Sequence, residues 1–215
     1  MYGKLYLYLK ELFIRFHKRL STLNVSFQLH NVDAGNLEET LGANGFDRIE
    51  VANISDGAYL GPAKTVCFMG ALLKSPAVNP HATLITLFMN AVSEMVTEQD
   101  ERATVQGDIK QVWKYMPPSP LVHSRYDAAM IVMDVGRTQV RDNDKYFDRY
   151  VKGHQFEEFA RFMNMEMKQV HTIIDKWPWK IKKRPEERGA KEEFETLFGS
   201  EQSGCERYVE WRIKS

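Results

Sequence analysis

Apolar residues recur at three- and four-residue intervals in the first twenty positions of the chain. The residues with this spacing are Leu5, Leu9, Leu12, Phe13, Phe16 and Leu20. Because a helix turns once in about 3.6 residues, such spacing gathers apolar side chains on one side. The pattern therefore predicts an amphipathic helix over residues 2–20, with lysines and arginines on its other side.

The next seventy residues alternate between strand-like and helix-like patterns. Residues 25–32 alternate apolar and polar positions and predict a half-buried strand, and residues 46–54 predict a second strand. Residues 82–89 (ATLITLFM) are apolar on both faces, which is typical of a strand inside a parallel sheet. Helices are expected between these strands, at residues 36–41 and from Pro62 to about residue 73. This order predicts an α/β fold with a mostly parallel, doubly wound, Rossmann-like sheet.

The rest of the chain is more helical. Residues 92–111 predict a helix, residues 126–135 fit either a buried helix or a strand, and residues 144–167 predict two short helices around Gly153. Residues 170–182 and 207–213 alternate aromatic and charged positions and predict a C-terminal antiparallel strand pair, with a short helix near residues 194–198 between them. We expect one domain over residues 1–215, with residues 91–168 as a helical insert or cover.

Composition and charge narrow the range of partners. The chain has 215 residues, of which 29 are Lys or Arg and 29 are Asp or Glu, so its formal net charge is zero. A protein that holds nucleic acid by charge needs a basic surface, so a nucleic-acid partner is not expected. No apolar run is long enough for a signal peptide or a spanning helix, which predicts a cytoplasmic protein with no membrane contact.

Two segments resemble the second half of the class I S-adenosylmethionine-dependent methyltransferase fold. VSFQLHNVDA, ending at Ala34, is similar to the strand of that fold that ends in Asp-Ala beside the adenine of the cofactor. FDRIEVANI, beginning at Phe46, is similar to the following strand, which ends at the reaction cleft. The resemblance implies S-adenosylmethionine as a cofactor. It implies a binding site formed by Asp33, Ala34, Asn53 and Asp56.

A second resemblance covers nearly the whole chain, from Tyr2 to Lys214. Five segments in order are similar to a largely fungal family of unknown function, related to the N-terminal region of dynein axonemal assembly factors. These segments are FDRIEVANISDGAYLGP, NPHATLITLFMNAV, DKYFDRYVKGHQF, HTIIDKWPWKIK and ERYVEWRIK. This resemblance implies a methyltransferase-like fold and a role in assembly.

The sequence departs from the methyltransferase pattern at its start. Those enzymes hold the cofactor with a strand, a glycine-rich turn and a helix, and such a unit needs about 30 residues or more. Only 24 residues precede the strand expected at 25–32, and they predict a single helix. We therefore expect no cofactor. Three explanations stay open: a fragment of a longer protein, a short protein that has lost catalysis, or a fold completed by a second chain.

Other candidate chemistry is sparse. No pair of histidines has the spacing of a helical metal site, and Cys67 and Cys205 lack a neighbouring histidine in the sequence, so we expect no metal and no catalytic residue. The basic and aromatic residues at 176–184, including Trp177, Trp179 and Lys182, could contact RNA. We predict a solvated strand there instead, because Glu186 and Glu187 follow at once.

Taken together, these patterns favour a non-catalytic interaction or assembly module, with a protein partner or self-association. A working S-adenosylmethionine-dependent methyltransferase is the alternative, and an RNA-contacting module is the third.

Overall fold

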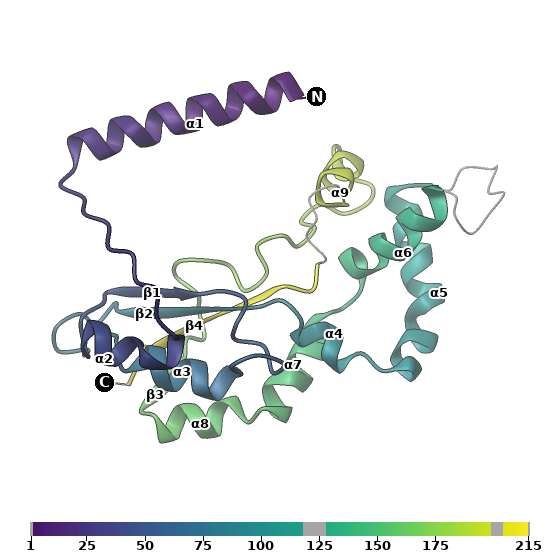
Figure 1. Cartoon of the computed structure of the whole chain (residues 1–215). Coiled ribbons are helices and arrows are strands. Elements are labelled where there is room, and N and C mark those ends of the chain that lie inside the picture. The colour runs from purple at the N-terminus through teal and green to yellow at the C-terminus, as the bar shows by residue number, and fades with distance from the viewer. Residues whose placement is uncertain (1, 118–127, 199–203, 215) are drawn as a thin grey trace. The chain divides into compact units, whose positions relative to one another are not determined.

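The computed structural model describes residues 2–117, 128–198 and 204–214. The chain divides into two units, Met1–Asp33 and Ala34–Ser215, which are described separately. The first unit holds one helix, α1 (Tyr2–Thr22), which confirms the helix predicted at residues 2–20. The second unit holds the sheet and the other helices (Figure 1).

The strand predicted at residues 25–32 is wrong, because these residues have no regular secondary structure. The alternating pattern does give the segment one apolar side. A strand also needs a neighbour that accepts and donates its backbone hydrogen bonds, and none of the described strands pairs with this segment.

The second unit is built on a mixed sheet in the order β1-β2-β4-β3. Its strands are β1 (Arg48–Val51), β2 (Thr83–Phe88), β3 (Met165–Met167) and β4 (Arg207–Ile213). β1 runs parallel to β2, whereas β4 is antiparallel to both β2 and β3. A mixed α/β fold is thus confirmed. The sheet is not mostly parallel, however, because only one of these three pairings is parallel.

The predicted helix between the two parallel strands is confirmed as α3 (Pro62–Gly70), with Pro62 at its first turn. A 3-10 turn, η1 (Ala34–Asn36), and a short helix, α2 (Leu37–Leu41), precede β1. Between β2 and β3 the chain forms α4 (Ala91–Met95), α5 (Glu98–Tyr115), α6 (Ala128–Val140), α7 (Asp144–Gly153) and α8 (Phe156–Phe162). The last helix, α9 (Ala190–Phe198), lies between β3 and β4. The ambiguous segment at 126–135 is therefore helical from residue 128, and its first two residues lie outside the described ranges.

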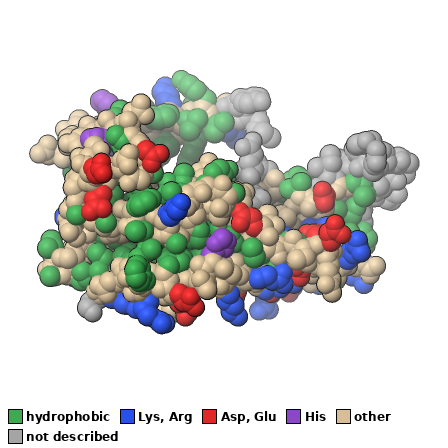
Figure 2. Space-filling view, turned by 60° about the horizontal axis from the view of Figure 1, so that its bottom comes forward, with side chains coloured by type: hydrophobic (Ala, Val, Ile, Leu, Met, Phe, Trp, Pro, Cys, Tyr) green, Lys and Arg blue, Asp and Glu red, His purple; other side chains and the backbone are tan. Residues whose placement is uncertain are grey.

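One face of the sheet packs against α3, α7 and α8 (Figure 1). At its centre, Phe88 of β2 lies 5.5 to 5.8 Å, centroid to centroid, from the rings of Phe147, Tyr150 and Phe156. Trp211 of β4 joins them, and its indole N–H donates to Thr86. These aromatic residues fix α7 and α8 against the strands. Figure 2 shows apolar side chains gathered over much of this side and charged ones along its lower margin.

The strand predicted at 170–182 is also wrong, and a buried carboxylate explains why. Glu210 of β4 is fully buried and accepts hydrogen bonds from the backbone amides of Thr172, Ile173 and Ile174, at 2.7 to 3.1 Å. These amides therefore cannot form a strand ladder. The Nζ of Lys168 also donates to Glu210 at 3.1 Å. Burial alone would raise the pKa of Glu210, but the amides and the ammonium group lower it to about 2.

Candidate functional site

Asp56 follows β1 at its carboxyl end, where open α/β sheets commonly hold ligands. Its side chain is fully buried, and Oδ2 accepts hydrogen bonds from the backbone amides of Met89 and Asn90 at 3.0 and 3.2 Å. Burial raises the pKa of Asp56 although these amides favour the ionised form. The carboxylate thus joins the end of β1 to the end of β2 and the start of α4.

Side chains from α4 and α7 occupy the space beside these strand ends. The hydroxyl of Tyr150 accepts a hydrogen bond from the amide of Gly57 at 2.8 Å, and its ring centroid lies 4.1 Å from that of His154. A Cβ atom added at Gly57 would lie 3.0 Å from the His154 ring and 3.3 Å from the Glu94 carboxylate. The side chains of His154 and Glu94 therefore lie close against one side of Gly57.

The pKa values of these residues follow from the same crowding. Partial burial, and then the charge of Asp56, raise the pKa of Glu94. Burial also raises the pKa of the Tyr150 hydroxyl above its ordinary value of 10.0. Burial thus disfavours the ionised form of both side chains.

The four residues that the resemblance assigned to cofactor binding lie in different surroundings. Asp56 is buried at the end of β1, and Asn53 is exposed in a left-handed backbone conformation with φ of 67°. Ala34 lies in η1 and lines a different part of the surface, along the outer edge of β1. Asp33 ends the first unit and is exposed. Their role in binding stays a prediction.

The outer edge of β1 borders an apolar groove of about 410 Å³. Its half-buried lining comes from η1, α2 and the region of β1, and consists of Ala34, Leu37, Leu41, Phe46, Ile49 and Ile54. The buried side chains of Val51, Met69 and Leu72 close its base. Among the described strands, none pairs with β1 on this side, apart from a single bridge between Phe46 and Leu73.

The register of β1 shows which backbone groups face the groove. Arg48 lies opposite Thr83 in a parallel pair, and the carbonyl of Asp47 accepts from the amide of Thr83 at 3.0 Å. Since alternate residues of a strand bond to opposite sides, Ile49 and Val51 bond to β2. The amide and carbonyl groups of Arg48 and Glu50 therefore point away from β2, along the open edge.

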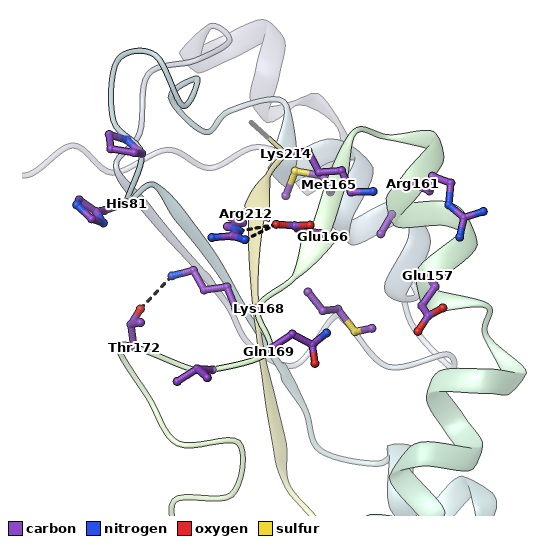
Figure 3. Close-up of a pocket in the computed structure, with 14 residues that line it drawn as sticks. His81, Glu157, Arg161, Met165, Glu166, Lys168, Gln169, Thr172, Arg212 and Lys214 are labelled. Atoms are coloured by element: carbon purple, nitrogen blue, oxygen red, sulfur yellow. Dashed lines mark hydrogen bonds and ion pairs between the residues drawn. The ribbon is translucent and has the colours of Figure 1, made fainter.

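A second, more polar pocket of about 540 Å³ lies between α8, β3 and the end of β4 (Figure 3). The ammonium group of Lys168 is already bound to Thr83 and Glu210, and the guanidinium group of Arg212 is paired with Glu166 at 2.6 Å. Two of the four Lys and Arg side chains that line this pocket, Lys168 and Arg212, are therefore paired with carboxylates of the protein itself.

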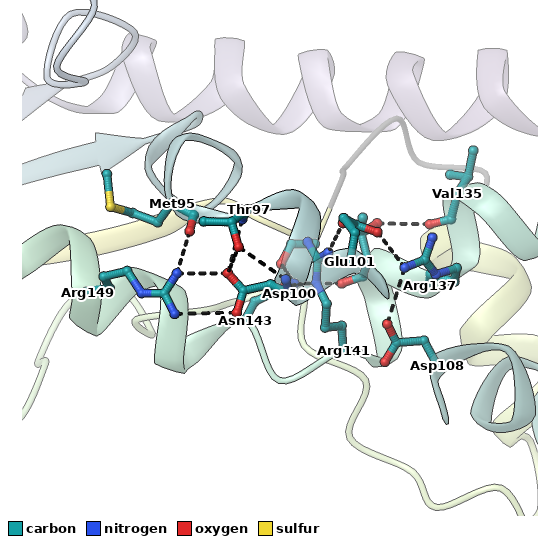
Figure 4. Close-up of polar contacts among 12 residues, drawn as sticks. Met95, Thr97, Asp100, Glu101, Asp108, Val135, Arg137, Arg141, Asn143 and Arg149 are labelled. Atoms are coloured by element: carbon teal, nitrogen blue, oxygen red, sulfur yellow. Dashed lines mark hydrogen bonds and ion pairs between the residues drawn. The ribbon is translucent and has the colours of Figure 1, made fainter. Parts of the chain in front are cut away.

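An ion-pair network joins α5 to α6 and α7 (Figure 4). Glu101 of α5 pairs with Arg137 and Arg141, each at 2.6 Å, and Asp100 pairs with Arg149 of α7 at 2.8 Å. The Arg149 guanidinium, followed by hydrogen bonds from Thr97, lowers the pKa of Asp100. Each of these charges has a partner, so the network holds the helices together and leaves little for a ligand.

The basic and aromatic cluster at 176–184 does not form a stacking platform at its first tryptophan. Trp177 is 9% exposed, and the guanidinium carbon of Arg207 lies 3.9 Å from its ring centroid. The amides of Lys182 and Lys183 donate to the carboxylate of Glu193 in α9. The Trp177 ring is therefore used inside the protein, which leaves less aromatic surface for RNA bases.

Comparisons with known proteins add no further constraint. No family model, no curated protein and no solved structure matches this chain. In the part of the chain that the structure describes, no three His, Cys, Asp or Glu side chains are grouped so that they could hold a metal ion. Nor does any helix in those ranges have the length and apolar character needed to cross a membrane.

Proposed function

We propose that this protein is a non-catalytic interaction module that binds an extended segment of protein along the outer edge of β1. The observation that carries the proposal is the combination of unpaired backbone groups and an apolar groove at one place. Arg48 and Glu50 offer amide and carbonyl groups for a new strand, and the groove offers sites for alternate apolar side chains. Such an edge favours strand addition because backbone bonds give affinity and the groove gives selectivity.

The crowding at the carboxyl ends of β1 and β2 supports this proposal indirectly, because it weakens the methyltransferase alternative. The side chains of His154 and Glu94 lie against Gly57, and Oδ2 of Asp56 accepts hydrogen bonds from the amides of Met89 and Asn90. The methyltransferase alternative is the weaker proposal, because a cofactor there would have to displace these side chains. The β1-α3-β2 unit remains the feature that supports a Rossmann-like relationship.

An immobilised array of extended peptides with alternating apolar residues tests the proposal. Two variants at one position form a matched pair. Glu50→Pro removes the outward amide and keeps the bonds to β2, since proline is tolerated on an edge strand where its missing N–H faces solvent. Glu50→Ala removes the same side chain and keeps the amide.

We expect peptides that bind the natural protein to bind Glu50→Ala with similar affinity and to lose at least tenfold in affinity for Glu50→Pro. The proposal fails if no peptide binds, or if both variants bind as the natural protein does. Circular dichroism and the melting temperature of the two variants show whether the fold is retained.

A further inference from the structure

We propose that the pocket between α8, β3 and the end of β4 binds a small phosphate monoester, a hydroxylated organic molecule that carries one phosphate group. The sheet has the order β1-β2-β4-β3, so this pocket lies at the opposite end of the sheet from β1. The inference therefore goes beyond the proposed function and does not depend on it. The pocket volume of about 540 Å³ is in the range of sites that hold small molecules.

Two of the cations that line this pocket have no counter-ion. Lys168 and Arg212 are paired with carboxylates of the protein, as described above. Arg161 of α8 and Lys214, which follows β4, form no ion pair within the described residues. Arg161 is exposed and Lys214 is half-buried, so a ligand can reach both from solvent. Their charge favours an anion, which each can bind through charge-assisted hydrogen bonds.

The backbone brings these two cations to the same end of the pocket (Figure 3). Asn164 forms a tight turn between α8 and β3, with a left-handed φ of 54°. Its amide donates to the carbonyl of Arg161 at 3.2 Å, and its carbonyl accepts from the amide of Lys214 at 2.9 Å. Arg161 and Lys214 thus come from different elements and can bind the same phosphate group, arginine through parallel N–H groups and lysine through its ammonium group.

The outer edge of β3 adds backbone donors to this pocket. The amide of Lys168 donates to the carbonyl of Glu210 in β4 at 2.8 Å. Since alternate residues of a strand bond to opposite sides, the amides of Met165 and Met167 point away from β4. Both methionines line the pocket. Backbone amides at the edge of a cavity bind anions, because their N–H dipoles are directed at the negative charge.

The rest of the lining indicates what the phosphate group is attached to. Ala160 and Met165 are buried and form an apolar base, whereas Glu157 and Gln169 are exposed and polar. Glu157 can accept hydrogen bonds from ligand hydroxyls, and its charge would repel a second phosphate. The described lining contains no Phe, Tyr or Trp on which a nucleobase could stack. These residues favour a hydroxylated monophosphate over a nucleotide or a bisphosphate.

Isothermal titration calorimetry of the full chain with glycerol 3-phosphate tests the inference. Arg161→Gln with Lys214→Gln removes the two unpaired cations. Lys110→Gln with Lys152→Gln is the matched control, because it removes the same charge at exposed positions of α5 and α7 that do not line the pocket. We expect saturable binding in the millimolar range or tighter. The first double variant should raise the dissociation constant about tenfold or more, and the control about twofold at most, at equal ionic strength. Melting temperatures show whether each variant keeps its fold.

Three further ligands separate the parts of the proposed molecule. Glycerol lacks the phosphate, glycerate carries a carboxylate in its place, and inorganic phosphate lacks the organic part. We expect no binding of glycerol, and weaker binding of glycerate and of inorganic phosphate than of glycerol 3-phosphate. If glycerate binds equally well, the assignment of a phosphate is wrong. If inorganic phosphate binds equally well, the pocket selects an anion only, and the assignment of an ester is wrong.

NMR titration with glycerol 3-phosphate shows where the ligand binds. The amide resonances of Met165 and Met167 should move, and those of Arg48 and Glu50 in β1 should not. The inference is overturned if no saturable binding occurs, if the two double variants bind equally, or if the moving resonances lie away from the pocket. None of these results changes what is expected for peptides at the edge of β1, so the two proposals can fail separately.

Discussion

The two edges of the sheet differ in how they are covered by the rest of the chain. Beyond the short strand β3, the edge of β4 is covered by residues 168–176, which are held by the buried carboxylate of Glu210 and by a bond from the amide of Tyr208 to the carbonyl of Lys176. The edge of β1 has one bridge at Phe46 and then runs open along an apolar groove. One edge is covered by residues of the protein itself, whereas no described strand pairs with the other edge beyond the bridge between Phe46 and Leu73.

The difference shows what closing an edge requires. Glu210 is buried with its charge, and this is stable only because three amides and the Lys168 ammonium surround it. No comparable group covers β1 among the described residues. Proteins usually shield an exposed edge with charge, proline or a covering loop. The groove beside β1 is lined mainly by apolar side chains, with the exposed charges of Arg48 and Glu50 beside them, and we interpret it as a docking edge.

The largest change in the free energy of unfolding is expected for a substitution at Glu210, on the edge that the chain covers itself. Glu210→Gln replaces an acceptor of several amide bonds by a neutral group and leaves Lys168 without its counter-charge. We expect the free energy of unfolding to fall by about 3 kcal/mol, as when one partner of a buried pair is removed. Urea denaturation measures it, with Glu158→Gln on the exposed side of α8 as the control. A loss no greater than that of the control would show that the covering loop is held by something else.

The same carboxylate predicts how stability depends on pH. Its pKa is about 2 in the folded protein and has an ordinary value of 4.5, so the unfolded chain binds more protons between these values. The contribution of Glu210 is complete above pH 4.5 and is lost as the pH falls toward 2. We expect urea titrations to show this loss in the natural protein. In Glu210→Gln, the corresponding part of the pH dependence should disappear.

A smaller effect is expected at the carboxyl end of β1. Gly57→Ala would bring a methyl group to 3.0 Å from His154, and we expect it to cost about 1–2 kcal/mol as an overpacking substitution. Gly153→Ala is the matched control, because no atom lies within 4 Å of the added Cβ atom at that position. Thermal melting compares the two. Equal stability would mean that the strand end is more open than these contacts indicate.

The smallest change in melting temperature is expected when S-adenosylmethionine is added. A ligand at 100 times its dissociation constant adds about 2.7 kcal/mol to stability, which raises the melting temperature of a domain of this size by several degrees. We expect no change with millimolar S-adenosylmethionine, because α4 and α7 occupy the strand ends. A dose-dependent rise would instead support the methyltransferase alternative.

Elements with strong local signals could be predicted from the sequence, and those that depend on distant partners could not. The apolar period of α1, the Pro62 start of α3 and the apolar run of β2 each indicate the right element. Residues 170–182 have a strand-like pattern, but Glu210 binds their amides from more than thirty residues away.

The residues of the candidate site also fall into those that the sequence could place and those that it could not. Asp56 could be placed at the end of a strand by its position in the sequence. Tyr150 and His154 could not, because they reach Gly57 from a helix about ninety residues later in the chain and no motif links the two segments. The groove was missed for another reason: the alternating pattern at 25–32 predicts a strand, whereas these residues have no regular secondary structure.

Amide hydrogen exchange at β1, followed by NMR at two protein concentrations, tests the central claim most directly. The amides of Ile49 and Val51 bond to β2 and should exchange slowly at both concentrations, whereas those of Arg48 and Glu50 should exchange quickly in dilute solution. We predict that the second pair becomes protected when the chain associates or binds a peptide. Equal protection of all four amides in dilute solution, or exchange at Arg48 and Glu50 that association leaves unchanged, would contradict the account.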